Sequence, residues 1–431
     1  MKTILPVRRA VVLAGGGNER MGQLAPKSVL PVVNHPNVRI VMEKLHDEGL
    51  SEFFVNSHRG LVLDAAREGT HPSTRSIHAY LESAPIGTAT FSKRVAVEHD
   101  FPREEPFLVV AADISHPTMR FGRFIQAFTE ARQEDRKLVG AVAFVLRPYD
   151  EVIDRYPVAI IDENNRILKF KEKPRNRHQA YRIFNQIRNR AVREACERVG
   201  VPCLPVNASY YVVLGEMFDL VPEPRHIPSH DYDYGKYLFK RMPPSRMLAY
   251  FIAESVRRGQ PRVKKEWIDM ATPSDFWLAN WLYIKTAPQK VRGAYDHVHN
   301  VYSGKDLVLD PRAEVVNSIL GDNVEIGPGS VIRNCVIGNN CRISGAELSK
   351  SVVFNAFLLD VQVKVEESVV GGHFPLIVSS EFGQASLSRR LITASRSGKI
   401  SIERLDIKPE DGQLAEACFE KLKFQKQPNE R

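Results

Sequence analysis

The stretch VVLAGGGNERMGQLAPK, residues 11–27, decides how the chain folds and what it binds. A short aliphatic run leads into three consecutive glycines, and a polar loop with Arg20 ends at Pro26 and Lys27. Glycine lets the backbone approach a ligand closely, and the N–H groups of such a loop bind phosphate oxygens. Guanidinium and ammonium groups are also phosphate ligands. We therefore predict that this loop binds a polyphosphate with the help of both cations.

Two better-known phosphate-binding patterns do not match this stretch. No Gly-Lys-Ser or Gly-Lys-Thr follows the glycines as in a P-loop, and the spacing differs from the G-x-G-x-x-G of dinucleotide-binding folds. A strand-to-helix turn without a ligand is the simpler alternative. Arg20 and Lys27 favour phosphate binding, because both cations lie in the same loop.

The composition of the 431 residues excludes several classes of protein. Hydrophobic residues make up 43% of the chain, which is enough for a buried core, and no run of about 18 apolar residues predicts a membrane-spanning helix. The N-terminus lacks the apolar run and cleavage site of a signal peptide. The five cysteines are scattered without C-x-x-C spacing, which argues against a disulfide framework or a zinc site and favours a cytoplasmic location.

The formal charge of +9 is compatible with nucleic acid or with smaller anionic ligands. Lysines and arginines are spread along the whole chain and form no basic arm. This distribution favours anionic small molecules, and we expect neither a nucleic-acid partner nor a membrane partner.

Strand-like and helix-like segments alternate in the first 120 residues. Buried strands that alternate with helices indicate parallel βαβ units. We expect an α/β protein with a Rossmann-like, doubly wound mixed sheet, in which ligands bind at the carboxyl ends of the strands. The predicted strands are 10–13, 52–55, 76–81 and 106–111, and the predicted helices are 39–48, 61–67 and 88–98.

The pattern continues less regularly and gives one α/β domain over residues 1–285. The further predicted strands are 137–146, 158–161, 167–170 and 207–214, and the further helices are 234–241 and 273–284.

The pattern changes after residue 285. Residues 286–305 have the composition of a linker, and beyond them aliphatic residues recur every five to six positions with glycine and asparagine between them. A coil of short strands with one inward aliphatic residue per side holds that period, so we predict a short parallel β-helix of about three turns over residues 306–372. Residues 373–431 form a C-terminal extension that we expect to be partly mobile. The predicted inward residues are Ile326, Ile332, Ile337, Ile343, Leu348, Val353, Leu358, Val363 and Val369.

The glycine-rich stretch resembles the signature of the sugar-1-phosphate nucleotidyltransferases, also called NDP-sugar pyrophosphorylases. Their pattern, L-A-G/A-G-x-G-T/S-R-M/L followed by a variable loop and P-K or K-P, corresponds here to residues 13–21 and to Pro26-Lys27. Asn18 and Glu19 stand where the family has Gly and Ser or Thr. The resemblance implies that the start of the loop binds the nucleotide through Leu13, Ala14, Gly15 and Gly16.

Further motifs of the family follow in order, so that the resemblance covers residues 8–370. E-S-A-P-I-G-T-A (82–89) resembles the segment that reads the base. A-A-D-I (111–114) follows a buried strand where the family has its metal-binding aspartate, and W-I-D-M-A-T-P (267–273) resembles W-x-D-x-G-T-P, whose aspartate is the second metal ligand. A left-handed parallel β-helix after the catalytic domain is common in the same family.

Three more motifs concern the sugar phosphate and the nucleotide. F-K-E-K-P (170–174) and N-A (207–208) resemble elements that bind the sugar phosphate and the sugar hydroxyls. D-Y-G-K (233–236) is similar to the D-F-G-K of the ADP-glucose enzymes.

The resemblance implies a reaction without a protein nucleophile. The phosphate oxygen of a sugar 1-phosphate attacks the α-phosphorus of a nucleoside triphosphate, and pyrophosphate leaves. Arg20 and Lys27 would be the catalytic cations, and Asp113 and Asp269 would hold Mg²⁺, which takes one or two carboxylates besides phosphates. The remaining implied residues are Glu82, Gly87 and Thr88 for the nucleotide, and Glu172, Lys173 and Asn207 for the sugar phosphate.

Each of these side chains also has a structural alternative. Asp113 could be a strand-end turn residue, Asp269 a loop acid, and Asn207 a strand cap. Arg20, Lys27 and Lys173 could be ordinary surface cations, and Glu172 a turn acid.

Glu82 bears on the base, because a carboxylate only accepts hydrogen bonds. Guanine offers two adjacent donors, and glutamate at this position resembles the mannose-1-phosphate guanylyltransferases, whereas the uridylyl and thymidylyl enzymes carry glutamine. We expect GTP with mannose 1-phosphate. The D-Y-G-K motif favours ATP with glucose 1-phosphate, so an ATP- or UTP-dependent glucose-1-phosphate nucleotidyltransferase stays open.

Two rival interpretations remain. A catalytically silent regulatory or assembly subunit is one, because four family glycines are replaced, by Asn18, Ala112, Ser209 and Ala271. An acyltransferase site in the coils is the other, but the predicted coil region holds no histidine for a base. We expect a homo-oligomer, with the coils as the candidate interface.

Overall fold

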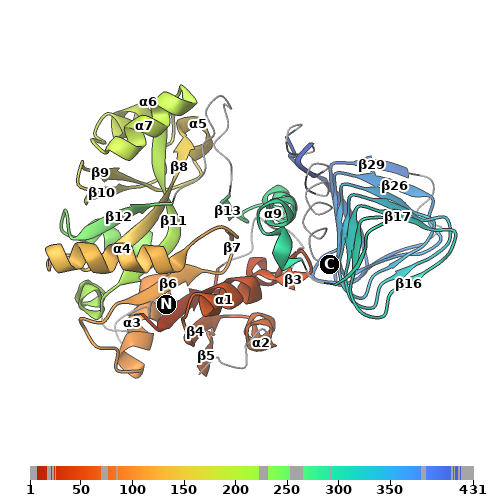
Figure 1. Cartoon of the computed structure of the whole chain (residues 1–431), viewed down its shortest axis with the longest axis horizontal. Helices are drawn as coiled ribbons and strands as arrows, with labels where there is room; N and C mark the ends of the chain where they lie inside the picture. The colour runs from red at the N-terminus through yellow and green to blue at the C-terminus, as the bar shows by residue number, and fades with distance from the viewer. Residues whose placement is uncertain are drawn as a thin grey trace, which may run out of the picture. The chain divides into compact units, whose positions relative to one another are not determined.

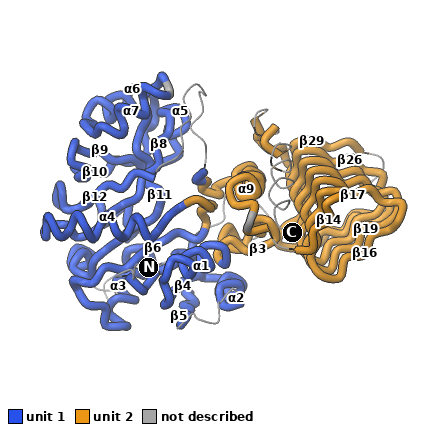
Figure 2. Tube along the Cα trace, in the orientation of Figure 1, with its two compact units in different colours: residues 1–16, 39–112, 119–267 blue, residues 17–38, 113–118, 268–431 orange. Residues whose placement is uncertain are grey.

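The computed structural model describes residues 7–16, 21, 24, 26–68, 76–83, 86–222, 232–252, 266–291, 293–379, 385–408, 411, 413–415 and 418. The chain divides into two units, coloured separately in Figure 2. Unit 1 holds residues 1–16, 39–112 and 119–267, and unit 2 holds residues 17–38, 113–118 and 268–431.

A nine-stranded mixed sheet forms the centre of the described part of unit 1 (Figure 1). The order is β10-β9-β11-β6-β1-β4-β5, and β8 joins β11 to β12. β1 is parallel to β4 and β6, whereas β11 is antiparallel to β6, β8 and β9. The strands are β1 (Arg9–Leu13), β4 (Glu52–Ser57), β5 (Ser76–Leu81), β6 (Phe107–Ala111), β8 (Gly140–Pro148), β9 (Val158–Ile161), β10 (Ile167–Lys171), β11 (Cys203–Val213) and β12 (Met247–Phe251).

Helices cover both faces of this sheet, which confirms the predicted doubly wound α/β fold. Successive residues of a strand point to opposite faces. On β11, the Tyr211 ring contacts Phe239 of α8 at 5.1 Å, and the Tyr210 ring contacts Phe121 of α4 at 5.2 Å. The helices that begin in or belong to this part of the chain are α1 (Asn37–Asp47), α2 (Gly60–Glu68), α3 (Thr88–Glu98), α4 (Phe121–Glu134), α5 (Tyr149–Val152), α6 (Arg177–Phe184), α7 (Arg190–Val199), α8 (Phe239–Arg241), the 3₁₀ helix η3 (Gly215–Leu220) and the π-helix η5 (Tyr234–Leu238).

The central strands β1 and β6 are apolar on both sides. Val11 and Val12 of β1 and Val109 and Val110 of β6 are all fully buried. A parallel strand between two layers of helices has no solvent face, so it is a continuous aliphatic run rather than an alternating one. This is why the sequence signal for both strands is strong.

The described part of unit 2 contains a parallel β-helix with three sheets (Figure 1). β15 to β29 form five complete coils, which exceeds the about three turns that the spacing predicts. The coil strands are β15 (Val301–Ser303), β16 (Val308–Leu309), β17 (Glu314–Val316), β18 (Ser318–Leu320), β19 (Glu325–Ile326), β20 (Val331–Arg333), β21 (Val336–Ile337), β22 (Arg342–Ile343), β23 (Glu347–Ser349), β24 (Val352–Val353), β25 (Ala356–Leu358), β26 (Val363–Glu366), β27 (Val369–Val370), β28 (Leu376–Val378) and β29 (Ala385–Ser388).

One of the three sheets continues beyond the coils at both ends. β14 pairs antiparallel with β15, β30 continues the sheet in parallel after β27, and β31 pairs antiparallel with β30. These strands are β14 (Ala294–Asp296), β30 (Arg390–Ala394) and β31 (Ile400–Arg404). The other elements of unit 2 are η2 (Lys27–Val29), β2 (Pro31–Val32), β3 (His35–Pro36), β7 (Ile114–Ser115), β13 (Ile268–Asp269), α9 (Pro273–Thr286) and η6 (Pro288–Lys290).

The predicted inward aliphatic residues line the coil core, with one exception. Val370, rather than the predicted Val369, points inward on β27. Val369 belongs instead to an outward row on the sheet of β15, β18, β21, β24, β27 and β30, and every residue of this row is buried. The row is Tyr302, Ile319, Val336, Val352, Val369 and Leu391.

Helix α9 is one of the elements that pack against this region of the coil. The indole of Trp277 donates to the backbone oxygen of Lys350 at 2.9 Å, and the Phe276 ring contacts Phe354 edge to face at 5.7 Å. Asn280, fully buried on α9, accepts from the backbone N–H of Val33 at 2.7 Å. α9 is therefore fixed inside unit 2 by apolar packing and by directed hydrogen bonds.

Asparagine occupies one corner of the first coils. Asn300, Asn317 and Asn334 all have φ between 49° and 54°, the left-handed region that asparagine tolerates better than most residues. The side chain of Asn300 donates to that of Asn317 at 2.9 Å. The recurring asparagines in the sequence thus mark the corners.

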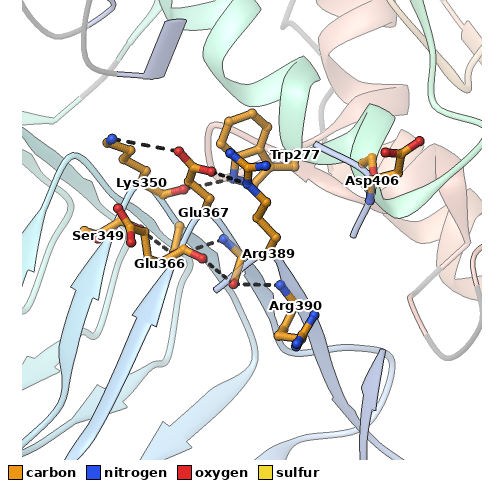
Figure 3. A network of polar contacts seen from close by, with 11 residues as sticks. Trp277, Ser349, Lys350, Glu366, Glu367, Arg389, Arg390 and Asp406 are labelled. Atoms are coloured by element: carbon orange, nitrogen blue, oxygen red, sulfur yellow. Dashed lines mark hydrogen bonds and ion pairs between the residues drawn. The ribbon is translucent and has the colours of Figure 1, made fainter. Parts of the chain in front are cut away.

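Charged residues replace asparagine at the same corner in the later coils (Figure 3). Lys350, Glu367 and Arg389 have φ of 47°, 45° and 52°, which costs each about 1 kcal/mol. The Glu367 carboxylate lies 2.7 Å from Arg389 Nε and 3.8 Å from Lys350 Nζ, and its side chain is only 10% exposed. The ion pairs offset the backbone cost at this corner.

The chain also has no helix, within the described ranges, that is long and apolar enough to cross a membrane.

We expect Glu367→Gln to lower the free energy of unfolding of the coil by about 2 kcal/mol. The substitution removes the negative charge that pairs with Lys350 and Arg389, and it leaves both cations beside a neutral, mostly buried amide. The matched control is Glu347→Gln, since the Glu347–Lys364 pair is equally short at 2.7 Å but about half exposed. That variant should lose less than about 1 kcal/mol. Thermal or urea unfolding measures both. Equal losses in the two variants would contradict this explanation of the corner.

Candidate active site

The loop after β1 begins at the carboxyl edge of the unit 1 sheet. The backbone N–H of Ala14 donates to Asn56 Oδ1 at 3.2 Å, and Asn56 Nδ2 donates to Glu82 Oε2 at 3.1 Å. Asn56 is the second-last residue of β4, and Glu82 directly follows β5. The hydrogen-bonded chain of Ala14, Asn56 and Glu82 therefore joins the carboxyl ends of three neighbouring parallel strands, β1, β4 and β5. The Ala14 N–H determines which way the Asn56 amide points. Asn56 is the residue that sequence reasoning missed, although it directly follows the predicted strand 52–55.

Glu82 is buried, with 7% of its surface exposed. Burial raises the pKa of its carboxyl group, while the hydrogen bond from Asn56 and the charge of Arg94 oppose that change. Its Oε1 atom is buried and has no hydrogen-bond partner among the described residues. One carboxylate oxygen is therefore held by Asn56, and the other is a buried acceptor without a partner in the described part of the chain.

Gly15 is needed where the loop passes these two side chains. A Cβ atom at this position would lie 3.0 Å from Asn56 Nδ2 and 3.4 Å from Glu82 Oε2. A side chain would therefore displace the Asn56–Glu82 pair. Leu13 ends β1, and Gly16 is the last described residue before the segment 17–20.

Gly87 and Thr88 lie at the start of α3, against the D-Y-G-K motif. Gly87 has φ of 89°, and a Cβ there would come within 2.9 Å of the Tyr232 backbone oxygen. The backbone N–H and the hydroxyl of Thr88 donate to Asp233 Oδ1 at 3.0 and 3.2 Å, and the hydroxyl accepts from the Tyr234 N–H at 3.1 Å. Asp233 thus caps α3, which gives the motif a structural role in this chain.

Asn207 lies on β11 at an irregularity in its pairing with β8. Its Oδ1 accepts from the Ser209 N–H at 2.9 Å, and its Nδ2 donates to the Tyr211 hydroxyl at 3.2 Å. Ser209 has φ of 61°, which explains why a glycine suits this position in the family pattern. Asn207 therefore stabilises the bulge with part of its hydrogen-bonding capacity.

Glu172 and Lys173 follow β10 and are exposed. Glu172 Oε1 lies 2.5 Å from Lys240 Nζ. Lys171 on β10 lies opposite Val158, which in turn lies opposite Val206, so the end of β10 is two strands away from the Asn207 region. The structure brings the F-K-E-K-P motif and the N-A motif to one part of the unit 1 sheet.

In unit 2, Asp269 ends β13, and Asp113 directly precedes β7, the strand that pairs with β13. β7 pairs antiparallel with β13, and Asp269 lies directly opposite Ile114, the residue after Asp113. The Met270 N–H donates to the Asp113 backbone oxygen at 3.1 Å. The Cα atoms of the two aspartates are therefore within about 7 Å, because Asp113 is the chain neighbour of the residue opposite Asp269.

Lys27 reaches the same place. Its Nζ lies 3.8 Å from Asp113 Oδ2, and the two side chains are 11% and 31% exposed. Lys27 begins the short helix η2 directly after Pro26, whose fixed φ is suited to such a start. Arg20, the other predicted cation, lies outside the described residues.

The donor set suits a hard divalent cation. Aspartate oxygens are the ligand type of a Mg²⁺ site, in which phosphates and water complete the shell. No cluster of three or more histidine, cysteine, aspartate or glutamate side chains that could hold a metal occurs in the part of the chain that the structure describes. The arrangement therefore fits a cation that a phosphate ligand helps to bind.

Comparison with known proteins identifies the family. The family model for nucleotidyl transferases matches residues 9–286, and the model for bacterial transferase hexapeptides (six repeats) matches residues 317–350. The chain belongs to the nucleotidyl transferase family, with hexapeptide repeats after the matched domain. The family and the coil predicted from the motifs are thereby confirmed.

The individual relatives are distant. A UTP–glucose-1-phosphate uridylyltransferase of Synechocystis sp. (strain ATCC 27184 / PCC 6803 / Kazusa) is 22% identical over 286 residues, which are 63% of this chain and 62% of that protein. The match thus spans less than two thirds of that relative's length. Crystal structures of HddC from Yersinia pseudotuberculosis, complexed with GMP-PN and in a second structure, are 16% and 15% identical with TM-scores of 0.44 and 0.45, and each covers 64% of this chain and 98% of the other.

The raised pKa of Glu82 predicts how Glu82→Gln changes stability with pH. The ordinary pKa of a glutamate is 4.5, and that of Glu82 in the folded protein is higher. At a pH above 4.5, the folded protein therefore holds the Glu82 proton more tightly than the unfolded chain does. Stability therefore falls as pH rises through this range, and glutamine removes that loss while it keeps an oxygen for Asn56. We expect the melting temperature of Glu82→Gln, minus that of the wild type, to increase as the pH rises above 4.5.

Glu130→Gln, at an exposed position on α4, is the control and should show no such trend. A difference for Glu82→Gln that stays flat or falls with rising pH would refute the burial argument.

Proposed function

We propose that this chain transfers a nucleotidyl group from a nucleoside triphosphate to a sugar 1-phosphate and releases pyrophosphate. The observation that carries the proposal is the placement of Lys27, Asp113 and the Asp269 strand together in unit 2. A cation beside one carboxylate, with a second aspartate on the adjoining strand, supplies the residue types that bind metal-bound phosphates. Membership of the nucleotidyl transferase family and the likeness to a sugar-1-phosphate uridylyltransferase support the same reaction.

In the proposed reaction the protein positions its substrates and stabilises charge. Lys27 and Arg20 bind the phosphates of the nucleotide, and Lys173 binds the sugar phosphate. A Mg²⁺ ion held by Asp113 and Asp269 would neutralise charge on the phosphates. The proposal assigns the remaining contacts to the β1 loop with Leu13, Ala14, Gly15 and Gly16, to Gly87 and Thr88 for the nucleotide, and to Glu172 and Asn207 for the sugar hydroxyls.

GTP is the proposed nucleotide, and mannose 1-phosphate is the proposed acceptor. The support is Glu82 Oε1, a buried acceptor oxygen without a partner in the described parts of the chain. Guanine has adjacent N–H donors that match such an oxygen, and uracil has only one. The alternative is UTP or ATP with glucose 1-phosphate. UTP is favoured by the similar Synechocystis protein, a UTP–glucose-1-phosphate uridylyltransferase, and ATP by the D-Y-G-K motif.

A silent subunit of the same fold is the second candidate. Its support is the Lys27–Asp113 contact of 3.8 Å, because an ammonium group beside this carboxylate can substitute for a metal charge. In the active protein, phosphates and metal would separate the two side chains. In a silent subunit, the contact would persist in the presence of nucleotide.

Free thiols at all five cysteines support a cytoplasmic location, where thiols stay reduced. A homo-oligomer that assembles through the coils remains part of the proposal.

The test is an assay of the full-length protein with Mg²⁺, each nucleoside triphosphate in turn, and a panel of sugar 1-phosphates. Pyrophosphate release identifies the active pair. Release with GTP and mannose 1-phosphate supports the proposal in full, and release with another pair corrects the substrates. No release with any pair, although nucleotide binds, supports the silent subunit.

We expect Asp113→Asn to lower the turnover at least about 100-fold, because a neutral amide binds Mg²⁺ far more weakly than a carboxylate. The backbone contact of Asp113 with Met270 does not depend on the side-chain charge, and the ion pair with Lys27 is long at 3.8 Å, so the melting temperature should change little. Asp150→Asn, an exposed acid at the start of α5, is the control and should keep full activity. Near wild-type turnover in Asp113→Asn would remove the metal assignment.

Glu82→Gln should change the base preference. Asn56 Nδ2 keeps its acceptor only if the glutamine oxygen faces Asn56, which turns the new amide NH₂ towards the ligand. A donor there repels the guanine N–H groups and suits the carbonyl oxygens of uracil. We expect the ratio of kcat/KM for GTP to that for UTP to fall at least about tenfold. An unchanged ratio would show that Glu82 does not contact the base.

A further inference from the structure

Two cysteines meet where α7 turns back into β11. α7 ends at Val199, and the next residue, Gly200, caps it with a left-handed φ of 77°. Three residues later, the N–H of Cys203 donates to the sulfur of Cys196 at 3.0 Å. The spacing in E-A-C-E-R-V-G-V-P-C therefore becomes a direct contact, although it resembles no redox motif in the sequence.

The distance is short enough for a disulfide. Adding one N–Cα bond to the 3.0 Å contact puts the Cys203 Cα within about 4.5 Å of the Cys196 sulfur. The two Cα atoms are then within about 7 Å of one another, at the upper limit of disulfide geometry.

The two thiols differ in exposure and in acidity. Cys196 is partly exposed, whereas Cys203 is fully buried. The hydrogen bond from the Cys203 side chain, together with the Cys203 N–H and the charge of Arg193, lowers the pKa of Cys196 to about 7 against the opposing effect of burial. The Cys196 side chain and burial raise the pKa of Cys203, with Glu151 adding to the rise and Arg147 opposing it. The accessible sulfur is thus the more nucleophilic one.

We propose that Cys196 and Cys203 form a thiol–disulfide exchange site for small-molecule disulfides such as glutathione disulfide. The Cys196 thiolate attacks one sulfur of the reagent, which forms a mixed disulfide and releases one glutathione thiolate. The Cys203 sulfur then attacks the Cys196 sulfur, the second glutathione leaves as thiolate, and it takes up the proton that Cys203 loses. The balance is one protein disulfide and two glutathione molecules from two protein thiols and one glutathione disulfide.

The other three cysteines provide internal controls. Cys335 and Cys341 lie in the coil core, where burial raises their pKa to about 12 and about 11. Cys418 is buried and donates to the Trp281 backbone oxygen at 3.0 Å. None of the three presents an accessible thiolate to a reagent.

The test treats the reduced full-length protein with glutathione disulfide, blocks the remaining thiols, and maps the peptides by mass spectrometry. The wild type should lose two hydrogens and give a peptide that links Cys196 to Cys203, and dithiothreitol should reverse the change. Cys203→Ser should stop at one glutathione on Cys196, because the second step has no nucleophile. Cys196→Ser should leave Cys203 unmodified. Melting temperatures show that both serine variants fold.

Three results would overturn the proposal. One is a wild-type map in which glutathione stays on Cys196 without a link to Cys203. Another is a Cys196 that reacts no faster than Cys335, Cys341 or Cys418. The third is a Cys196→Ser variant in which glutathione disulfide modifies Cys203 as fast as it oxidises Cys203 in the wild type. The wild-type map decides the question even if a serine variant fails to fold.

Discussion

A two-residue antiparallel ladder between β7 and β13 is the constraint on which the candidate metal site depends, because it alone brings Asp269 beside the residue after Asp113. So short a ladder has little stability of its own. Its support comes from α9, which begins four residues after Asp269 with a capping box of Thr272 and Asp275. α9 is bound in turn to the coil through Trp277. Within unit 2, α9 therefore connects the strand of Asp269 to the coil.

The proposed nucleotide-binding part of unit 1 has a different basis, the burial of the Glu82 carboxylate. Glu82 loses most of its hydration, and Asn56 replaces only part of it, which is why its pKa rises. An acceptor oxygen held in place before a ligand arrives needs no reorganisation when it binds a donor. Asn207 is similar, because its side-chain amide makes hydrogen bonds within the protein that hold it in place. These bonds to Ser209 and Tyr211 stabilise the β11 bulge near the end of β10.

Much of the fold was predictable because local patterns and tertiary burial agree. β5, β9 and α3 have the predicted bounds. For β9 and α3 the apolar pattern matches buried residues of the element. α4 was missed although Phe121, Phe124, Ile125 and Phe128 have helical spacing, and α7 was missed because charged residues dominate it. The coil repeat became unreadable where Lys350 and Glu367 replace asparagine at a corner. Motifs gave Asp113 and Asp269, but Asn56 matters through its contacts with Ala14 and Glu82, which no local pattern encodes.

The four replaced family glycines are an argument that the chain is catalytically silent. Their backbone angles show which of the replacements is strained. Of the three that the structure describes, only Ser209 has a positive φ, at 61°. Ala112 and Ala271 are buried at ordinary backbone angles, so a methyl group there adds packing without strain. Ser209 costs about 1 kcal/mol, and the hydrogen bond of its N–H to Asn207 offsets that cost. The fold thus accommodates these replacements locally, and the loss of glycine is a weaker argument against catalysis than the sequence alone implies.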